Sequence, residues 1–286
     1  MLEIQGHRGA RGLLPENTLP SFEAALDAGA HSIETDLHLT KDDVVVLYHD
    51  ARVTDRLCVP HPRRPRLVRS MTLKQLRRYR VGDAKATPVA QHFAKARGFD
   101  PYAIPTLDDL FLFVANYAAS PKKTATERAR ARLLIFDLEL KRVPFEPETI
   151  GDGFTGAAAG LLERLVLAAV HRAGVLDRVR VRSFDHRAVR AIKQREPTLQ
   201  TAILIYETAP CHVARLLEDA GADVYCPDYR FIDEGIVRQV HAAKKKIIPY
   251  TVNDEADWER LIAWRVDGIT TDYPSDLAEF LEPSQH

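Results

Sequence analysis

The chain has 286 residues, of which 45% are hydrophobic and 28% are charged, and its formal net charge is zero. This length fits two ordinary domains or one α/β barrel, and the balanced charge favours no particular class of partner. No apolar run approaches the roughly 20 residues that span a membrane, and the amino terminus lacks the charged-then-apolar pattern of a signal peptide. We therefore expect a cytoplasmic protein without a membrane span.

Strands and helices are predicted to alternate from the amino terminus onward. Residues 2–6 predict a strand, and the helix after it begins at Asn17 or Thr18 and stops at Gly29. Residues 32–39 predict the second strand, which the turn composition of residues 40–43 folds back as a hairpin. A turn centred near Asp42 brings His49 level with Asp36.

A basic stretch follows the hairpin. Residues 52–97 hold thirteen lysines and arginines against two acids, and four prolines argue against regular barrel elements. We interpret residues 52–103 as an insertion between the second strand unit and its helix. The stretch can attract an anionic substrate, or it can be a solvated basic surface. Its aromatic residues, Tyr79 and Phe93, are too sparse for base stacking, so we expect no nucleic-acid partner.

The remaining chain repeats one unit, a strand followed by a helix. Six further strands are predicted, at residues 132–141, 179–184, 201–206, 223–227, 246–252 and 267–272. With the first two they make eight, which predicts a single (β/α)8 TIM barrel domain over residues 1–286. A doubly wound open sheet is the alternative, and it is weakened because no GxGxxG turn follows the first strand.

Chemically active side chains gather at the predicted carboxyl ends of the first two strand units. Glu34 and Asp36 are two residues apart in a strand, so they point the same way, roughly 6–7 Å apart. His7 and Arg8 end the first strand, and His49 ends the hairpin. Working residues of such barrels lie at the carboxyl ends of the strands, so we expect these five side chains to converge.

The third predicted strand adds Asp137, Glu139 and Lys141, which alternate toward one face. Carboxylates without a nearby thiolate favour a hard divalent cation, Mg²⁺ or Ca²⁺, and also permit Mn²⁺. Two histidines near the carboxylates keep Zn²⁺ in consideration.

Together these side chains predict a site for phosphate esters. A divalent ion can neutralise the charge that develops on the phosphoryl oxygens, and Arg8 and Lys141 can hold the other oxygens. His7 and His49 titrate near neutrality, so they can act as base and acid on the attacking and departing oxygens.

Several side chains have a second interpretation. Lys141 can pair internally with Asp137 instead of contacting a phosphate. Glu16 and Asn17 are interpreted as capping and bracing the first helix. The histidines other than His7 and His49 are interpreted as surface or loop residues, although His38 shares the strand face of Asp36.

The stretch GHRGARGLLPENTLPSFEAALDAGAHSIETDLHLTKDDVVVLYHDARVTDR resembles the amino-terminal signature of the glycerophosphodiester phosphodiesterase family. The blocks DLELK, VRSFD, IPYTVND and DGITTDYP are similar to later blocks of that family, so the resemblance covers residues 2–56 and 104–281. Asp43 stands where a glycine is usual in the hairpin turn, and Tyr250 where a tryptophan is usual. The resemblance implies a (β/α)8 barrel with an insertion after the second strand.

The resemblance also implies the roles of the site residues: His7 and His49 form the catalytic acid/base pair, Arg8 and Lys141 contact the phosphate, and Glu34, Asp36 and Glu139 hold the metal. The implied reaction hydrolyses small glycerophosphodiesters to an alcohol and glycerol 3-phosphate, with help from the substrate's neighbouring hydroxyl. Two alternatives stay open. One is a lysophospholipase D or transphosphorylating lyase on the same scaffold, and the other is a non-catalytic phosphodiester-binding module. The sequence predicts neither the head group nor the oligomeric state.

Overall fold

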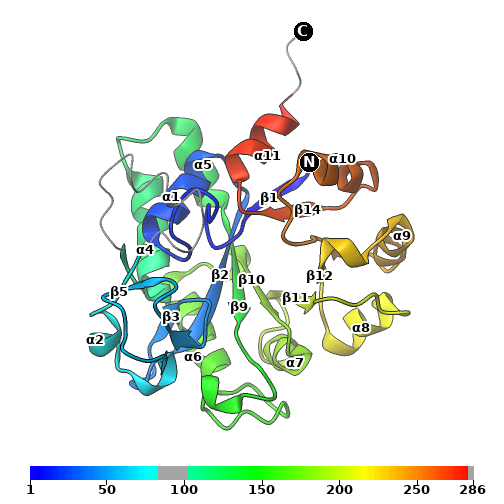
Figure 1. Cartoon of the computed structure of the whole chain (residues 1–286). Coiled ribbons are helices and arrows are strands. Elements are labelled where there is room, and N and C mark those ends of the chain that lie inside the picture. Colours follow the sequence, from blue (N-terminus) through cyan, green and yellow to red (C-terminus); the bar gives the residue numbers. More distant parts are fainter. Residues whose placement is uncertain (83–101, 283–286) are drawn as a thin grey trace.

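The computed structural model describes residues 1–82 and 102–282 (Figure 1). Its main sheet contains eight parallel strands, each hydrogen-bonded to the next in the spatial order β1, β2, β9, β10, β11, β12 and β13, with β14 on the other side of β1. Their bounds are Glu3–Gly6 (β1), Ser32–Leu39 (β2), Ile135–Leu140 (β9), Val179–Ser183 (β10), Gln200–Ile205 (β11), Val224–Pro227 (β12), Lys246–Ile247 (β13) and Gly268–Thr271 (β14).

Backbone hydrogen bonds also join the two ends of this sheet. The amide of Asp267 donates to the Ile247 carbonyl at 3.0 Å, and the amide of Thr270 donates to the Pro249 carbonyl at 3.0 Å. These bonds connect β13 to β14 and close the eight strands into a ring. The predicted (β/α)8 barrel is therefore confirmed, and the doubly wound open sheet is wrong.

Helices surround the strands in Figure 1, which looks along the barrel. Their bounds are Leu19–Asp27 (α1), Leu107–Ala119 (α4), Ala125–Leu133 (α5), Leu161–Ala173 (α6), His186–Arg195 (α7), Val213–Ala220 (α8), Glu234–Ala242 (α9), Glu255–Ala263 (α10) and Pro274–Leu281 (α11). Their apolar faces pack on the outside of the sheet and form the main hydrophobic core. Among the described residues, no helix has the length and apolar character needed to cross a membrane.

Local sequence signals set several helix ends. The Thr18 hydroxyl accepts from the Ser21 amide and caps α1, and Thr124 and Glu127 form a capping box that starts α5. Because α5 continues through Leu133, the third strand begins at Ile135. The predicted start of this strand at residue 132 is therefore wrong.

The β2–β3 hairpin projects beyond the barrel at the carboxyl end of β2. Its return strand, β3, spans Val45–Leu47 and pairs antiparallel with β2. The amide of Tyr48 donates to the Asp36 carbonyl at 3.0 Å, so Tyr48 lies level with Asp36. The prediction that His49 lies level with Asp36 is wrong by one residue, because the loop has three residues and ends in Asp43 with a left-handed φ of 59°.

Residues 52–82 and 102–103 form a lobe beside this hairpin, which we call the basic lobe. It contains five two-residue strands, β4 (Arg52–Val53), β5 (Cys58–Val59), β6 (Arg66–Leu67), β7 (Arg80–Val81) and β8 (Tyr102–Ala103), and the short helix α2 (Leu73–Leu76). The lobe has a small apolar core of its own. Residues 83–101 of the predicted insertion lie outside the described residues, and its interpretation as an insertion within one domain stays a prediction.

Candidate active site

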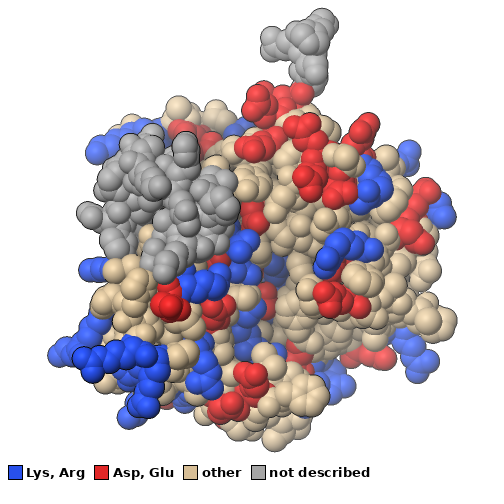
Figure 2. Space-filling view, viewed as in Figure 1, with Lys and Arg blue, Asp and Glu red and all other residues tan. Residues whose placement is uncertain are grey.

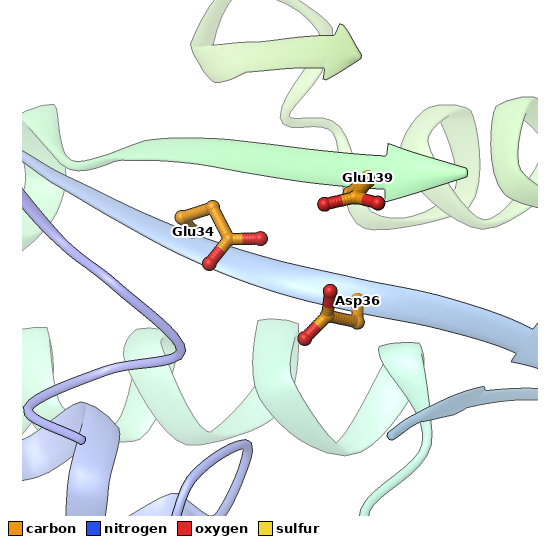
Figure 3. A group of neighbouring side chains, drawn as sticks. All are labelled: Glu34, Asp36 and Glu139. Carbon is orange, nitrogen blue, oxygen red and sulfur yellow. The ribbon is translucent and has the colours of Figure 1, made fainter. Parts of the chain in front are cut away.

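Three carboxylates lie together at the carboxyl ends of β2 and β9, and we call them the acid cluster: Glu34, Asp36 and Glu139. One carboxylate oxygen from each lies within 4.8 Å of the other two, and all three residues are buried. Figure 3 shows Glu34 and Asp36 on one strand and Glu139 on its neighbour, with their carboxylates turned toward one another. Parallel pairing places Asp36 opposite Glu139, which explains the convergence.

The carboxylates of the acid cluster repel one another, and this repulsion changes their pKa values. Burial, and then the negative charge of Asp36, raise the pKa of Glu34, which disfavours a negative charge on all three carboxyls at once. Burial acts in the same direction on Asp36, but the charges of Arg8 and Lys141 outweigh it and keep the pKa of Asp36 well below its usual range. Unequal pKa values are expected for neighbouring carboxyls that cannot all ionise without a cation.

Three cationic side chains border the acid cluster. The Arg8 Nε atom lies 3.2 Å from Asp36 Oδ2, and the Lys141 Nζ atom lies 2.7 Å from Glu139 Oε1 and 3.4 Å from Asp36 Oδ1. The alternative pairing of Lys141 with Asp137 is therefore wrong. Arg182, a fully buried residue of β10, reaches Glu34 Oε1 at 3.3 Å.

The contacts between these cations and the acid cluster are ion pairs more than well-aligned hydrogen bonds. Glu34 Oε1, Asp36 Oδ1 and Glu139 Oε1 accept no hydrogen bond of regular geometry, although Arg182 lies near the first and Lys141 near the other two. Three buried carboxylates that converge in this way supply the hard oxygen ligands that Mg²⁺, Ca²⁺ or Mn²⁺ prefers. The residues present therefore fit a divalent cation.

His7 directly follows β1 and is held by an acid from the last strand of the barrel. Its Nδ1 atom lies 2.6 Å from Asp272 Oδ1, and its Nε2 atom lies 4.0 Å from Glu34 Oε2. Burial, and then the charge of Arg8, lower the pKa of His7 despite its contact with Asp272. The Nε2 atom of a neutral ring therefore faces the acid cluster as a proton acceptor.

Asp272 is itself fixed by two further side chains. Its Oδ2 atom accepts from Arg11 Nη1 at 3.1 Å and from Asn253 Nδ2 at 2.9 Å. Burial raises the pKa of Asp272, but its interaction with His7 and the charge of Arg11 outweigh burial and lower the pKa well below its usual range. Asp272 thus stays ionised and can hold the Nδ1 proton of His7.

His49 follows β3, close enough to the acid cluster to help lower the pKa of Asp36, and is partly exposed. Its Nδ1 atom lies 2.8 Å from Asp50 Oδ1, which leaves Nε2 without a protein partner among the described residues. The backbone carbonyl of His49 accepts from His38 Nε2 at 3.2 Å. His38 is buried in β2, so its interpretation as a surface or loop residue is wrong.

Asn17 belongs to the site as well. Its side-chain amide donates to Asp36 Oδ2 at 2.8 Å, and its carbonyl accepts from the Thr35 hydroxyl at 2.7 Å. Glu16 accepts from Arg8 at 3.0 Å. The interpretation of Asn17 as a cap of α1 is wrong, because the Thr18 hydroxyl supplies the side-chain cap. Glu16 pairs with Arg8 and Arg11 in the turn before α1, so its bracing role stays a prediction.

Comparison with known proteins decides the family. The model of the glycerophosphoryl diester phosphodiesterase family matches residues 7–135 and 137–276, which include all seven predicted site residues. The chain belongs to this family. The predicted resemblance is confirmed, and so is the prediction that the chain is a phosphodiesterase of this class.

Relatives of the phosphodiesterase family match over nearly their whole length. A glycerophosphodiester phosphodiesterase of Bacillus altitudinis is 28% identical over 285 residues, which is 99% of both chains. The crystal structure of a protein of Silicibacter pomeroyi assigned to the same family is 26% identical, with a TM-score of 0.82 over 98% of this chain and 93% of that one. A phosphodiesterase of Oleispira antarctica, solved with the product sn-glycerol-3-phosphate, shares the fold at 21% identity, with a TM-score of 0.75 over 98% and 97%.

Proposed function

We propose that this phosphodiesterase hydrolyses glycerophosphodiesters to an alcohol and glycerol 3-phosphate, with His7 and His49 as the acid/base pair and a divalent cation on the acid cluster. One observation carries the proposal: two imidazoles, each with Nδ1 held by a carboxylate, border three converging carboxylates at the carboxyl end of the barrel. The Oleispira antarctica protein was solved with this product, which supports the assignment.

The chain's own groups can carry out both proton transfers. The ring of His7 is neutral and its Nε2 atom faces the acid cluster, so it suits the base that takes a proton from the attacking oxygen. His49, with Nδ1 on Asp50 and partly open to solvent, suits the acid that gives a proton to the departing alcohol. Each such transfer contributes typically 10²–10⁴ in rate.

Glu34, Asp36 and Glu139 would hold the cation, which when bound neutralises negative charge on the phosphoryl oxygens. Mg²⁺ and Ca²⁺ suit these oxygen ligands best, and Mn²⁺ is also permitted. Arg8 lies at Asp36 Oδ2 and Lys141 at Asp36 Oδ1, so both cations border the acid cluster and are placed to orient the phosphate and to balance its charge.

The test is product analysis by phosphorus NMR on a panel of glycerophosphodiesters and lysophospholipids. We expect glycerol 3-phosphate from the wild type, and turnover at least about 10²-fold lower in His7→Ala and in His49→Ala. His171→Ala, on the surface of α6, is the matched control and should keep full activity. Near-full activity in either site variant removes that histidine from the mechanism.

The lysophospholipase D and lyase alternatives give different products in the same experiment. A lyase yields a cyclic phosphate without consuming water, and a lysophospholipase D acts on the lysophospholipids of the panel. A non-catalytic binding module shows no turnover on any substrate. The cytoplasmic location stays a prediction, and the oligomeric state is left open.

A further inference from the structure

Exposed apolar side chains are concentrated at one end of the barrel. Among the described residues, nine large hydrophobic side chains are exposed, and five of them follow the carboxyl ends of β9 to β12: Val143, Phe145, Phe184, Tyr206 and Phe231. We call the four aromatic members the aromatic rim. Soluble surfaces usually carry such residues singly, so a row of them on neighbouring strands calls for an explanation.

The fold brings the aromatic rim to the same face as the acid cluster. Phe184 directly follows β10, and Tyr206 directly follows β11. Because the strands are parallel, their carboxyl ends meet at one mouth of the barrel. Phe184 is held there by an edge-to-face contact with Tyr250 at 6.2 Å between ring centroids, and the Tyr250 hydroxyl donates to the Ile205 carbonyl.

The basic lobe borders the same mouth, where its residues Val68–Ser70 contact Pro147–Thr149 in the segment that carries Phe145. Residues 56–82 contain nine lysines and arginines and no acid. Three of the nine pair with acids outside the lobe, and the other six are exposed: Arg63, Arg64, Arg66, Lys74, Arg78 and Arg80. Figure 2 shows lysine and arginine side chains gathered over the region where α2 and β5 lie in Figure 1.

Contacts fix the basic lobe to the active-site end of the barrel. Arg56 pairs with Asp50 at 2.9 Å, next to His49, and Arg69 pairs with Asp43 at 2.7 Å, at the tip of the hairpin. Positive charge and exposed aromatic rings therefore border the same opening.

We propose that the mouth of the barrel docks on an anionic lipid surface, with the basic lobe attracting the lipid phosphates and the aromatic rim entering the headgroup layer. Tyrosine favours this layer because its ring is apolar and its hydroxyl is polar, phenylalanine buries apolar area at the boundary with the acyl chains, and basic clusters bind anionic headgroups. Glu146 and Glu148 are exposed beside Phe145, so this part of the rim adds negative charge and the lobe supplies the attraction.

A lipid surface fits better than a nucleic acid. Single-stranded nucleic acids need aromatic platforms within the basic groove, where bases stack while the backbone is held. Among the side chains of the basic lobe that the structure describes, the one tyrosine, phenylalanine or tryptophan is Tyr79, and its ring is partly buried. Docking is independent of the proposed hydrolysis, although it would bring the active site toward lipid-derived phosphodiesters.

Sedimentation of the full chain with vesicles tests this proposal. Vesicles of phosphatidylcholine with about a quarter phosphatidic acid should bind the protein at low salt, and vesicles of pure phosphatidylcholine should bind it at least about tenfold more weakly. Arg63→Glu combined with Arg64→Glu should weaken binding at least about tenfold, and Phe145→Ser combined with Tyr206→Ser should weaken it severalfold. Turnover of water-soluble glycerophosphocholine should not change in these variants.

Matched controls are Arg215→Glu on α8 and Leu112→Ser on α4, which are exposed residues of the outer helices and should leave vesicle binding unchanged. The proposal is overturned if the wild type ignores anionic vesicles, if the controls weaken binding as much as the test variants, or if single-stranded RNA binds more tightly than anionic vesicles. Because sedimentation needs no turnover, its result can be interpreted whether or not the proposed hydrolysis is correct.

Discussion

At the scale of single residues, Asp272 is the side chain on which His7 depends. Its carboxylate lies 2.6 Å from His7 Nδ1 and is fixed by Arg11 and Asn253. An ionised acid in this position keeps the proton on Nδ1 and leaves Nε2 as the base. Asp272 therefore acts as a positioning residue for His7.

Asp272→Asn should lower kcat by about 10²-fold or more, because an amide permits the wrong tautomer of His7 and no longer stabilises its protonated form. The pH profile of kcat/KM should also shift, since removing the negative charge lowers the pKa of His7 further. Asp276→Asn, on exposed α11, is the control and should keep the wild-type profile. An unchanged profile in Asp272→Asn would show that the contact is only structural.

Two elements carry the site's geometry, and the first is the turn between β1 and α1. Gly9 has a left-handed φ of 90°, and a Cβ atom there would lie 2.7 Å from the Ser21 carbonyl carbon in α1. His7 and Arg8 precede this glycine in the turn. The close approach of turn and helix therefore positions both side chains.

Gly9→Ala should destabilise the fold by about 2 kcal/mol or more, since it combines an unfavourable φ with a backbone clash. Activity at a temperature where the variant is still folded should fall as well, because the turn has to move. Urea unfolding followed by circular dichroism gives the stability, and Gly174→Ala is the control for φ alone: it has φ 65° and no atom within 4 Å of the added Cβ. If both variants lost the same free energy of unfolding, close packing at Gly9 would not explain the loss.

The second element is the segment between β9 and α6, which a buried arginine ties down. Arg142 donates to Asp152 at 2.7 Å and 2.9 Å and also pairs with Glu163. Burial raises the pKa of Asp152, but the hydrogen bonds and charge of Arg142 outweigh it and lower the pKa to about 2. The ion pair therefore stabilises the segment that carries Phe145.

Asp152→Asn should lower the free energy of unfolding by about 2 kcal/mol at pH 7, because one of the two negative charges that pair with buried Arg142 is lost. A carboxyl whose pKa is lowered in the folded state stabilises the fold fully at pH values above its unfolded-state pKa, which is near 4. This stabilisation is lost as the pH falls toward the folded-state pKa of about 2. The stability difference from wild type should thus be constant from pH 7 to pH 5 and shrink below pH 4. Urea titrations across this range measure it, and a difference that grows on acidification would contradict the sign.

At the scale of the whole molecule, alternation of strands and helices was enough to predict the barrel, and the i, i+2 spacing of Glu34 and Asp36 was enough to predict one wall of the site. The role of Asp272 was not predicted and Arg182 was not singled out, because their contacts with His7 and Glu34 join strands far apart in the chain. The hairpin register was one residue off, since only the backbone shows that Asp43 takes a left-handed φ.

The role of Asn17 was also missed because it depends on a contact between elements. A polar residue before a helix usually caps it, and the sequence offered Thr18 as an equal candidate. The choice depends on the buried carboxylate of Asp36, which lies on a different element and accepts from Asn17. Local patterns therefore placed the elements, whereas contacts between elements assigned the polar side chains.

Cation dependence tests the central claim most directly. Turnover of glycerophosphocholine should be measured after EDTA treatment and then with added Mg²⁺, Ca²⁺ or Mn²⁺, in the wild type and in Glu139→Gln. The account predicts loss of activity with EDTA, recovery with at least one of the three ions, and at least about a tenfold higher ion requirement in the variant. Full activity in EDTA, or an unchanged requirement in Glu139→Gln, would contradict a cation held by Glu34, Asp36 and Glu139.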